Sequence, residues 1–212
     1  MHIELYHYWR SSCSWRVRWA LGLKQVTYSA FPVNLLKGEH LSEDFLALNP
    51  SGLVPALKVD GKVLTESLSI LEWLEESFPA KPLLPSEPMG RAEVRELAYR
   101  IACGIQPVQN LRVMQYYSPD PKVRAEYARH WISKGFEALE ARLSTTAGTY
   151  AYGNQLTIAD LCLVPQVYNA LRFQVDISQY PAISRVNENC LSGRECQLAA
   201  PHNQQGAQAQ EP

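Results

Sequence analysis

A cluster of prolines divides this chain into two parts whose hydrophobic patterns differ. Pro79, Pro82, Pro85 and Pro88 fall within ten residues, a spacing that allows neither a continuous helix nor a central strand. The 212 residues are enough for two small domains with separate cores. We therefore expect a first domain over residues 1–78, a linker over 79–88, a second domain over 89–200 and a polar tail over 201–212.

The charge balance and the lengths of the apolar runs exclude several functional classes. Basic and acidic residues number 20 and 21, so the chain has no net positive field to hold nucleic acid or an anionic membrane surface. The apolar runs are far shorter than the roughly 18 residues of a membrane-spanning helix, and the first residues lack the basic and apolar segments of a secretory signal. We expect a cytoplasmic protein that binds neither nucleic acid nor membranes.

The cysteines indicate neither a disulfide framework nor a metal site. They are odd in number, far apart and without a Cys-x-x-Cys or His-x-x-x-His pair. We expect most of them to be reduced core residues, and no bound metal. The five are Cys13, Cys103, Cys162, Cys190 and Cys196.

The start of the first part predicts a β-α-β unit. Residues 3–8 alternate like a strand, residues 12–23 carry apolar side chains at helical spacing, and residues 27–34 are again β-branched and aromatic. A right-handed crossover makes the two strands parallel. Pro32 lacks a backbone donor, which places the second strand at an edge of the sheet.

The rest of the first part predicts a hairpin followed by a helix. Residues 55–59 and 62–65 flank Asp60-Gly61, a pair that favours the type I′ turn of a tight hairpin. Residues 67–78 then have an amphipathic helical pattern. The order β-α-β followed by β-β-α is that of a thioredoxin-like domain.

The second part has helical spacing throughout. Apolar residues recur three or four apart over residues 94–111, with Pro107 as a kink, and again over 128–143. Thr157 and Asp160 form a capping-box pattern before an apolar helix that we expect at the centre of the domain. The predicted fold class is therefore α+β, with an N-terminal thioredoxin-like domain followed by an all-α domain.

The loop after the first strand carries the most reactive group of side chains. Ser11, Ser12, Cys13 and Ser14 lie at the start of a predicted helix, where free amides and the helix dipole favour an anion. A thiolate is the group best suited to these donors. The alternative is that Ser11 or Ser12 only caps the helix while Cys13 fills space in the core.

Two further segments suit a peptide-like ligand. A proline directly before a strand is compatible with a cis bond, which would leave the Val54 backbone open for pairing with an extended chain. Glu66 and Ser67 open the next helix, offering a carboxylate for an ammonium group and a hydroxyl with amides for a carboxylate. Each element alone also fits a tight turn or a helix cap, but together they favour a γ-glutamyl tripeptide.

Residues 11–18, Ser-Ser-Cys-Ser-Trp-Arg-Val-Arg, closely resemble the corresponding loop of zeta-class glutathione transferases, the maleylacetoacetate isomerases. The resemblance extends to about Pro201. It implies a glutathione transferase fold, glutathione as coenzyme and a homodimer. It also rests on Asn49-Pro50, Val54-Pro55, Glu66-Ser67, Gly104-Ile105-Gln106-Pro107, Ala159-Asp160 and residues 163–167.

The resemblance assigns a role to each site residue. Ser11 would activate the glutathione sulfur with Ser12 and Cys13 beside it, and His40, Val54, Glu66, Ser67, Gln106, Asn110 and Arg112 would bind the rest of glutathione. His40 is expected at the glycyl end, Val54 at the cysteinyl backbone, and Glu66 with Ser67 at the γ-glutamyl group. Two residues depart from the family: Glu66 replaces a frequent glutamine, and Arg112 replaces a small polar residue.

The implied activity is the cis–trans isomerisation of maleylacetoacetate to fumarylacetoacetate in aromatic amino-acid breakdown. The substrate carries two carboxylates, so we expect Arg10 and Arg172 to bind it. Arg172 has an alternative role in satisfying the carbonyls at a helix end. Arg16 ranks third, because it can equally pair with an acid at the surface.

Other functions remain open at this stage. The same reaction on maleylpyruvate, a shorter acid, is favoured by the additional charge of Arg112. Redox chemistry at Cys13 is less favoured, because Ser11 occupies the start of the loop where such proteins have cysteine. A general glutathione transferase and a non-catalytic glutathione-binding protein complete the alternatives.

Overall fold

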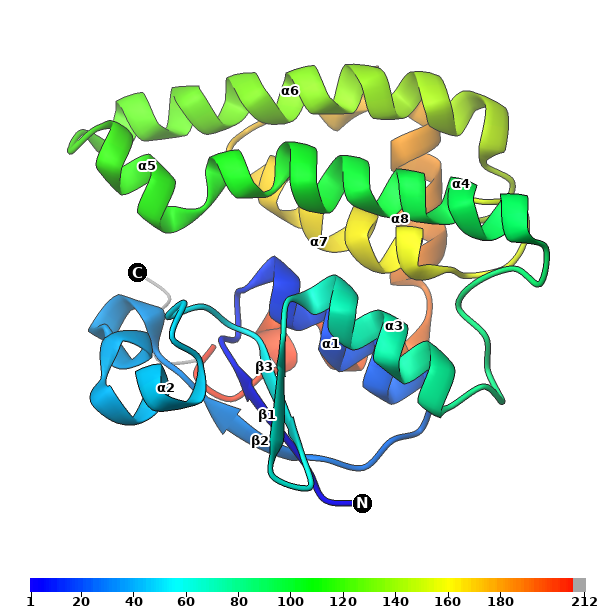
Figure 1. Ribbon diagram of the computed structural model, residues 1–212. Coiled ribbons are helices and arrows are strands. Elements are labelled where there is room, and N and C mark those ends of the chain that lie inside the picture. Colours follow the sequence, from blue (N-terminus) through cyan, green and yellow to red (C-terminus); the bar gives the residue numbers. More distant parts are fainter. Residues whose placement is uncertain (208–212) are drawn as a thin grey trace. The chain divides into compact units, whose positions relative to one another are not determined.

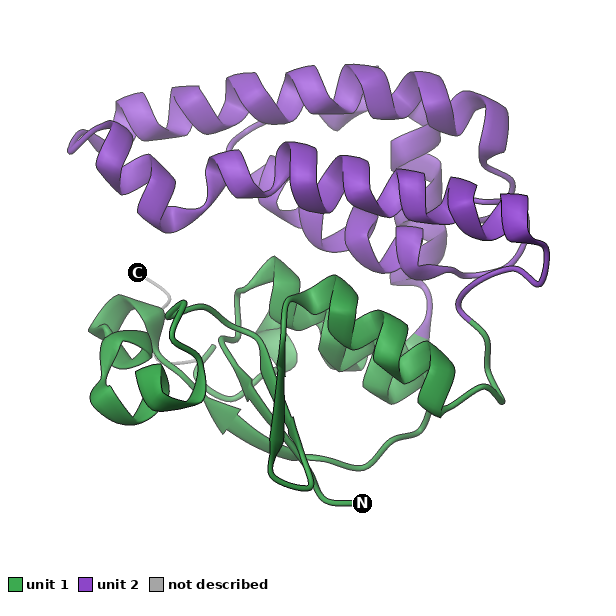
Figure 2. Cartoon of the chain, in the orientation of Figure 1, with its two compact units in different colours: residues 1–82, 194–212 green, residues 83–193 purple. Residues whose placement is uncertain are grey.

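The computed structural model describes residues 1–207 and shows two compact units (Figures 1 and 2). Unit 1 comprises residues 1–82 and the described residues from 194 onward, and unit 2 comprises residues 83–193. Unit 1 contains β1 (Ile3–His7), α1 (Ser12–Leu23), β2 (Ser29–Pro32), η1 (Leu35–Lys37), η2 (Glu39–Leu41), α2 (Glu43–Leu48), β3 (Ala56–Val59), β4 (Lys62–Thr65), α3 (Ser67–Ser77), α9 (Arg194–Ala199) and η6 (Pro201–Asn203). Unit 2 contains α4 (Pro88–Tyr99), the π-helix η3 (Arg100–Ile105), η4 (Pro107–Gln109), α5 (Leu111–Tyr117), α6 (Pro121–Thr146), α7 (Ile158–Arg172), η5 (Ile177–Gln179) and α8 (Pro181–Leu191).

Unit 1 is built on a four-stranded mixed sheet of order β2-β1-β3-β4. β1 and β2 are parallel, while β1 with β3 and β3 with β4 are antiparallel. The predicted β-α-β unit and the edge position of the strand ending in Pro32 are confirmed. Asp60 and Gly61 have φ values of 45° and 88°, as the positive φ at both central positions of a type I′ turn requires.

Helices cover both faces of this sheet. Ile3 and Leu5 alternate with more exposed residues along β1 and are buried on the face that packs under α1 and α3, which lie side by side (Figure 1). Tyr6 points the other way and meets the ring of Phe45 from α2, with centroids 6.5 Å apart. The sheet therefore has an apolar layer on each side, as in a thioredoxin-like domain.

Helix α7 is the buried centre of unit 2, as its apolar sequence predicts. Its capping box forms: the Asp160 carboxylate accepts hydrogen bonds from the Thr157 amide at 2.8 Å and the Thr157 hydroxyl at 2.9 Å. The second oxygen of Asp160 accepts from the amide of Ala151 at 2.7 Å. Burial nevertheless raises the pKa of Asp160 to about 6, because the protein interior disfavours the charged form.

The structure differs from the predicted domain limits at the C-terminal end. Helix α9 packs against α1 in unit 1, so residues 194–200 do not belong to the helical domain. Cys196, Ala199 and Pro201 are buried, and residues 201–207 are not the loose tail that their polar composition predicts. The apolar side chains are few, but they are spaced to cover the surface of α1. Residues 208–212 of the predicted tail lie outside the described residues.

The predicted kinked helix over residues 94–111 is instead broken. After α4 the backbone passes through the π-helix η3 and the 3-10 turn η4 before α5 begins. Gly135 on α6 lies so close to η3 that an added Cβ would clash with the Ile105 side chain. Trp131, predicted to face the core, is 43% exposed.

None of the helices formed by the described residues is long and apolar enough to cross a membrane. These residues contain no group of three or more His, Cys, Asp or Glu side chains placed to hold a metal ion. Their five cysteines are free thiols, three of them buried.

We expect Asp160→Asn to change how stability depends on pH. The raised pKa means that the folded state binds the proton more tightly, so the contribution of Asp160 is full below about pH 4 and lost as pH rises through about 6. The unfolding free energy of the wild type, minus that of the variant, should fall by on the order of 2–3 kcal/mol between pH 4 and pH 7. Urea unfolding followed by circular dichroism measures this difference.

Asp176→Asn is the matched control with the opposite sign. Asp176 is exposed, and hydrogen bonds from Ser178 and Gln179 lower its pKa. Its contribution is present above the ordinary pKa and lost as pH falls, so the advantage of the wild type over this variant should grow as pH rises. If the difference in unfolding free energy between the wild type and Asp160→Asn stays constant with pH, the raised pKa of Asp160 is contradicted.

Candidate functional site

The loop between β1 and α1 presents a hydroxyl at a helix N-terminus. Ser11 is the N-cap of α1, and its Oγ accepts a hydrogen bond from the amide of Ser14 at 3.1 Å. The hydroxyl hydrogen stays available, because an accepting hydroxyl can still donate. Ser11 and Cys13 are half-buried and Ser12 is buried. A thiolate near Ser11 would meet both this hydrogen and the positive end of the helix dipole.

A buried arginine links this loop with the start of α3. Arg16 is 1% exposed, and its Nη1 donates to Ser67 Oγ at 3.1 Å and lies 3.6 Å from Cys13 Sγ. The alternative pairing of Arg16 with an acid at the surface is therefore wrong. The structure brings together two segments, the Ser11–Cys13 loop and the Glu66–Ser67 turn, that are more than 50 residues apart in the chain.

Glu66 has an unusual backbone conformation at the start of α3. Its φ is +64° and its ψ is 113°, a region that non-glycine residues rarely adopt and that tends to occur at ligand sites. The Glu66 carboxylate is exposed and forms no hydrogen bond that caps the helix. It is thus available to a cationic group, while the first amides of α3 are available to an anion.

Val54 offers an open stretch of backbone. The Val54–Pro55 peptide bond is cis, as the sequence allowed. Within the described residues, neither the amide nor the carbonyl of Val54 takes part in a hydrogen bond. An extended peptide can therefore pair with both groups.

His40 lies in η2 with a free ring nitrogen. Its Nδ1 is buried and has no hydrogen-bond partner among the described residues. Burial lowers the pKa of His40, so the imidazole is neutral near pH 7. The backbone carbonyl oxygen of His40 would lie 3.3 Å from a Cβ added to Gly52. The η2 turn therefore lies close to the segment before β3.

The strand register explains why these segments gather. Tyr6 of β1 pairs with Ala56 of β3, and Ala56 pairs with Thr65 of β4. His7 pairs with Pro32 of β2. The loop with Ser11, the turn with His40, the segment with Val54 and the turn with Glu66 therefore all leave or enter the sheet at the same end.

The residues predicted from the helical part lie on two segments of unit 2. Gln106 follows η3 and is half-buried. Asn110 caps α5 by accepting from the Arg112 amide at 3.3 Å. The Arg112 side chain is exposed and forms no hydrogen bond or ion pair within the part of the chain that the structure describes.

A chain of buried amides, not predicted from the sequence, joins these segments to Arg172. Gln109 Nε2 donates to Gln166 Oε1 at 2.7 Å, and Asn169 Nδ2 lies 3.4 Å from Gln109 Oε1. Arg172 Nη1 donates to Asn169 Oδ1 at 2.8 Å. The only signal in the sequence is the presence of amides among apolar helical positions.

A different arginine satisfies the carbonyl that follows α7. Arg129 Nε donates to the Phe173 carbonyl at 2.9 Å, and Arg129 Nη2 donates to the Gln174 side chain at 3.2 Å. Arg172 lies over the Phe173 ring instead, 5.3 Å from its centroid, and its side chain is exposed. Arg10, the other arginine expected to bind substrate, lies 5.2 Å from the Trp9 ring centroid.

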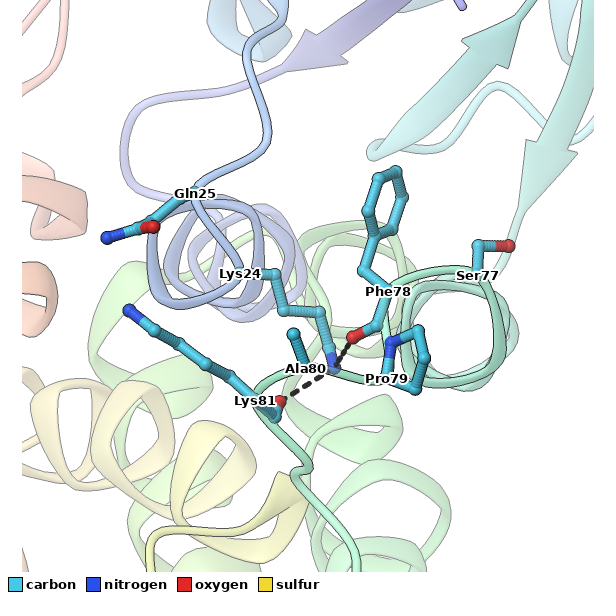
Figure 3. Close-up of a pocket in the computed structure, with 7 residues that line it drawn as sticks. All are labelled: Lys24, Gln25, Ser77, Phe78, Pro79, Ala80 and Lys81. Carbon is cyan, nitrogen blue, oxygen red and sulfur yellow. Dashed lines mark hydrogen bonds between the residues drawn. The ribbon is translucent and has the colours of Figure 1, made fainter.

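A surface pocket of about 500 Å³ at the far ends of α1 and α3 is not part of this site. Its lining includes Lys24, whose ammonium donates to the carbonyls of Phe78 and Lys81, each at 2.9 Å (Figure 3). The same ammonium donates to the Glu75 carboxylate at 2.9 Å. All three protons are used. We interpret Lys24 as a structural residue that holds the end of α3.

Comparison with known proteins identifies relatives over nearly the whole chain. The models for the glutathione S-transferase N-terminal and C-terminal domains match residues 10–77 and 109–193. The maleylacetoacetate isomerase of Mus musculus is 48% identical over 202 residues, which cover 94% of this chain and 93% of the mouse protein.

Solved structures agree with the sequence matches. A holo structure of a maleyl pyruvate isomerase, a bacterial glutathione S-transferase of the zeta class, is 44% identical with a TM-score of 0.93, and covers 96% of this chain and 99% of its own. The maleylacetoacetate isomerase of Anaeromyxobacter dehalogenans 2CP-1 is 41% identical with a TM-score of 0.87 and coverage of 97% of both chains. That structure holds dicarboxyethyl glutathione and citrate in its active site.

We expect Arg129→Ala to destabilise the protein more than Arg172→Ala. Arg129 satisfies a carbonyl at the end of α7, and the loss of such a cation costs about 1 kcal/mol. The Arg172 guanidinium is exposed and bonds a side chain. Thermal unfolding of the two variants compares them directly, and an equal or larger loss for Arg172→Ala would restore the helix-end role for Arg172.

Proposed function

Because the chain belongs to the glutathione S-transferase family, we propose that it is a glutathione-dependent isomerase that converts maleylacetoacetate to fumarylacetoacetate. The observation that carries this proposal is the Ser11 hydroxyl, which accepts from the first turn of α1 and keeps its hydrogen for a sulfur anion. Relatives of this chain at 44–48% identity are maleylacetoacetate isomerases.

The residues of unit 1 fit a γ-glutamyl tripeptide. The open Val54 backbone suits the cysteinyl residue, and the Glu66 carboxylate suits the α-ammonium group. The Ser67 hydroxyl and the α3 amides suit the α-carboxylate, and the Arg16 cation behind Ser67 favours the same negative charge. The His40 imidazole is neutral in the free protein. A glycyl carboxylate beside it would raise the pKa of His40 and favour the protonated form.

Ser11 and helix α1 supply the thiol activation. Lowering a thiol pKa from about 8.5 to near neutrality requires roughly 2–3 kcal/mol. A hydrogen bond from Ser11 to a charged acceptor and the dipole of α1 together contribute energy of this size. Ser12 and Cys13 add polar groups in the same turn, and the Arg16 guanidinium near Cys13 adds positive charge.

Bound glutathione supplies a thiolate that adds reversibly to the cis double bond and so permits rotation about it. The arginines of this chain act on the other end of the substrate. Arg10 follows the Trp9 ring in the same loop as Ser11, and Arg172 is held by Asn169. Guanidinium groups suit the two carboxylates of the substrate, since each can donate two parallel hydrogen bonds.

Maleylpyruvate is the second candidate substrate. Arg112 favours it, because the guanidinium is exposed at the start of α5 and forms no hydrogen bond with the described residues. An additional cation suits a shorter acid in which the two carboxylates lie closer together. We assign Gln106 and Asn110, which precede Arg112 in the sequence, to glutathione binding.

We also propose a cytoplasmic homodimer that acts in tyrosine breakdown. The five free thiols suit a reducing compartment. The dimer and the pathway are properties that the family resemblance implies.

The assay that tests the function follows the ultraviolet absorbance of maleylacetoacetate and of maleylpyruvate with and without glutathione, each with a coupled hydrolase. Glutathione-dependent loss of absorbance supports the isomerase, and the ratio of the two rates identifies the preferred acid. Absence of turnover with both acids would favour redox chemistry at Cys13 or a binding protein without catalysis. Retention on a glutathione resin distinguishes a redox protein or a non-catalytic binding protein from a protein that does not bind glutathione.

We expect Ser11→Ala to raise the pKa of the bound thiol by about one to two units and to lower turnover at neutral pH by about 10- to 100-fold. The variant loses the donor while the rest of the site remains. The thiolate absorbance of bound glutathione, titrated against pH, measures the first effect. Asp120→Ala is the control, since it removes another N-cap, that of α6; full turnover in Ser11→Ala would contradict the role of Ser11.

We expect Arg112→Ser to shift the substrate preference toward maleylacetoacetate. The change removes the cation that favours the shorter acid and leaves the residues of unit 1 intact. The ratio of kcat/KM for the two acids should change by about tenfold, which corresponds to the loss of one charge-assisted hydrogen bond. An unchanged ratio would remove Arg112 from the determinants of specificity.

A further inference from the structure

Helix α1 contains a second buried arginine that touches none of the groups assigned to ligand binding. Arg18 is 2% exposed and forms no ion pair within the described residues. Its Nε donates to the Ala199 carbonyl at 3.0 Å. Nη1 lies 3.2 Å from His7 Nδ1 and donates to the Tyr8 carbonyl at 3.3 Å, while Nη2 donates to the Trp9 carbonyl at 3.1 Å.

Three of these four contacts lie in the segment that leads to Ser11. Tyr8 and Trp9 are consecutive, and their carbonyls are held by the two ends of one planar guanidinium. The Tyr8 carbonyl also accepts from the Ser11 amide at 3.1 Å. The hydrogen bond from the Ser11 amide to the Tyr8 carbonyl closes the turn that sets the direction of Ser11. Arg18 fixes this turn to α1.

His7 completes the arrangement as an acceptor. Burial, assisted by the Arg18 charge, lowers the pKa of His7 to about 3. The imidazole is therefore neutral at pH 7, and the lone pair on Nδ1 can accept from Arg18. Burial also lowers the pKa of Arg18, to about 10, so the guanidinium stays charged near neutrality.

We propose that Arg18 is a positioning residue that holds the loop from Tyr8 to Ser11 so that the Ser11 hydroxyl points at the glutathione sulfur. This inference rests on the proposed function and assigns a role to a residue outside the site. Arg18 contacts no ligand group and acts through Ser11. The Ala199 carbonyl of α9 anchors the side of Arg18 that faces away from the loop.

The geometry requires arginine and not merely a cation. The three carbonyls and the imidazole lie in different directions around one guanidinium, and three separate nitrogens reach them. Lysine has one nitrogen on a flexible stem and cannot reproduce a rigid fork. Arg18→Lys therefore keeps the charge while it releases part of the loop.

A purely structural role for Arg18 is the competing explanation, and Lys24 provides the matched control. Both are buried cations, Arg18 on α1 and Lys24 at the C-cap of α1, and each holds two or more backbone carbonyls. Lys24 holds the end of α3, shown in Figure 3, and not the catalytic loop. Lys24→Met should therefore lower the melting temperature without changing the pKa of the bound thiol.

The test titrates the thiolate absorbance of bound glutathione in the wild type, Arg18→Lys and Lys24→Met, with no maleyl substrate present. We expect Arg18→Lys to raise the thiol pKa by about one unit and to lower kcat/KM at neutral pH by about tenfold. At a pH above the new pKa most of that activity should return, because the thiolate then forms without help.

The same substitution in a Ser11→Ala background separates positioning from a general loss of stability. If Arg18 acts through Ser11, Arg18→Lys should change the thiol pKa and kcat/KM by less than twofold in that background. An unchanged thiol pKa in Arg18→Lys, an equal effect in both backgrounds or the same shift in Lys24→Met would each overturn the inference. If the wild type binds no glutathione, the proposed function is overturned. If the wild type binds glutathione as a thiolate but has no isomerase activity, the thiol pKa still tests the role of Arg18.

Discussion

Unit 1 depends on hydrogen bonds from three buried cations, two on α1 and one at its C-cap. Arg16 reaches the start of α3, Arg18 reaches the loop after β1 and the end of α9, and Lys24 reaches the end of α3. Their acceptors include backbone carbonyls and the Ser67 hydroxyl, and Lys24 forms an ion pair with Glu75. A buried cation is costly unless its donors are satisfied. Each of these side chains therefore fixes the segments that it touches, and α1 sets the positions of the loops around it.

The two units divide the chemistry between charged and neutral polar groups. In unit 1 the Arg16 cation of α1 contacts Ser67 and Cys13, so α1 favours negative charge at the segments that we propose for glutathione. In unit 2 the amides of Gln109, Gln166 and Asn169 place Arg172 without adding a charge to the core. This neutral amide chain has a direction, because Asn169 donates to Gln109 and Gln109 donates to Gln166. It can thus orient a guanidinium at a lower desolvation cost than a buried ion pair.

Local sequence rules predicted the parts of the fold that short segments determine. Asp60-Gly61 specified the hairpin, Pro32 the edge strand and Thr157 with Asp160 the start of α7, because each depends on backbone geometry within a few residues. The end of the chain was predicted wrongly, since the polar residues 194–207 bury only a few apolar side chains and their partner is α1, about 180 residues earlier. Local sequence rules did not predict the burial of Arg16 and Arg18 either. A charged residue on a helix usually faces solvent, and only the acceptors supplied by distant segments make these two positions favourable.

The candidate site shows the same limit. The sequence singles out Ser11, Val54, Glu66 and Ser67 as candidates because each lies at a helix start or beside a proline, where backbone groups are free. It did not locate Gln109 or Asn169, whose role depends on a contact between η4 and α7. The residues that we propose to touch a ligand lie in short motifs at helix starts and turns, whereas those that we propose to orient them lie in the core and resemble ordinary packing. The arginines that we propose to bind substrate, Arg112 and Arg172, belong to unit 2, and Ser11, which we propose to activate the thiol, belongs to unit 1. Under this proposal, a change at Arg112 alters which acid is preferred while the thiol chemistry stays the same. This separation gives a physical reason why maleylacetoacetate and maleylpyruvate isomerases share one fold.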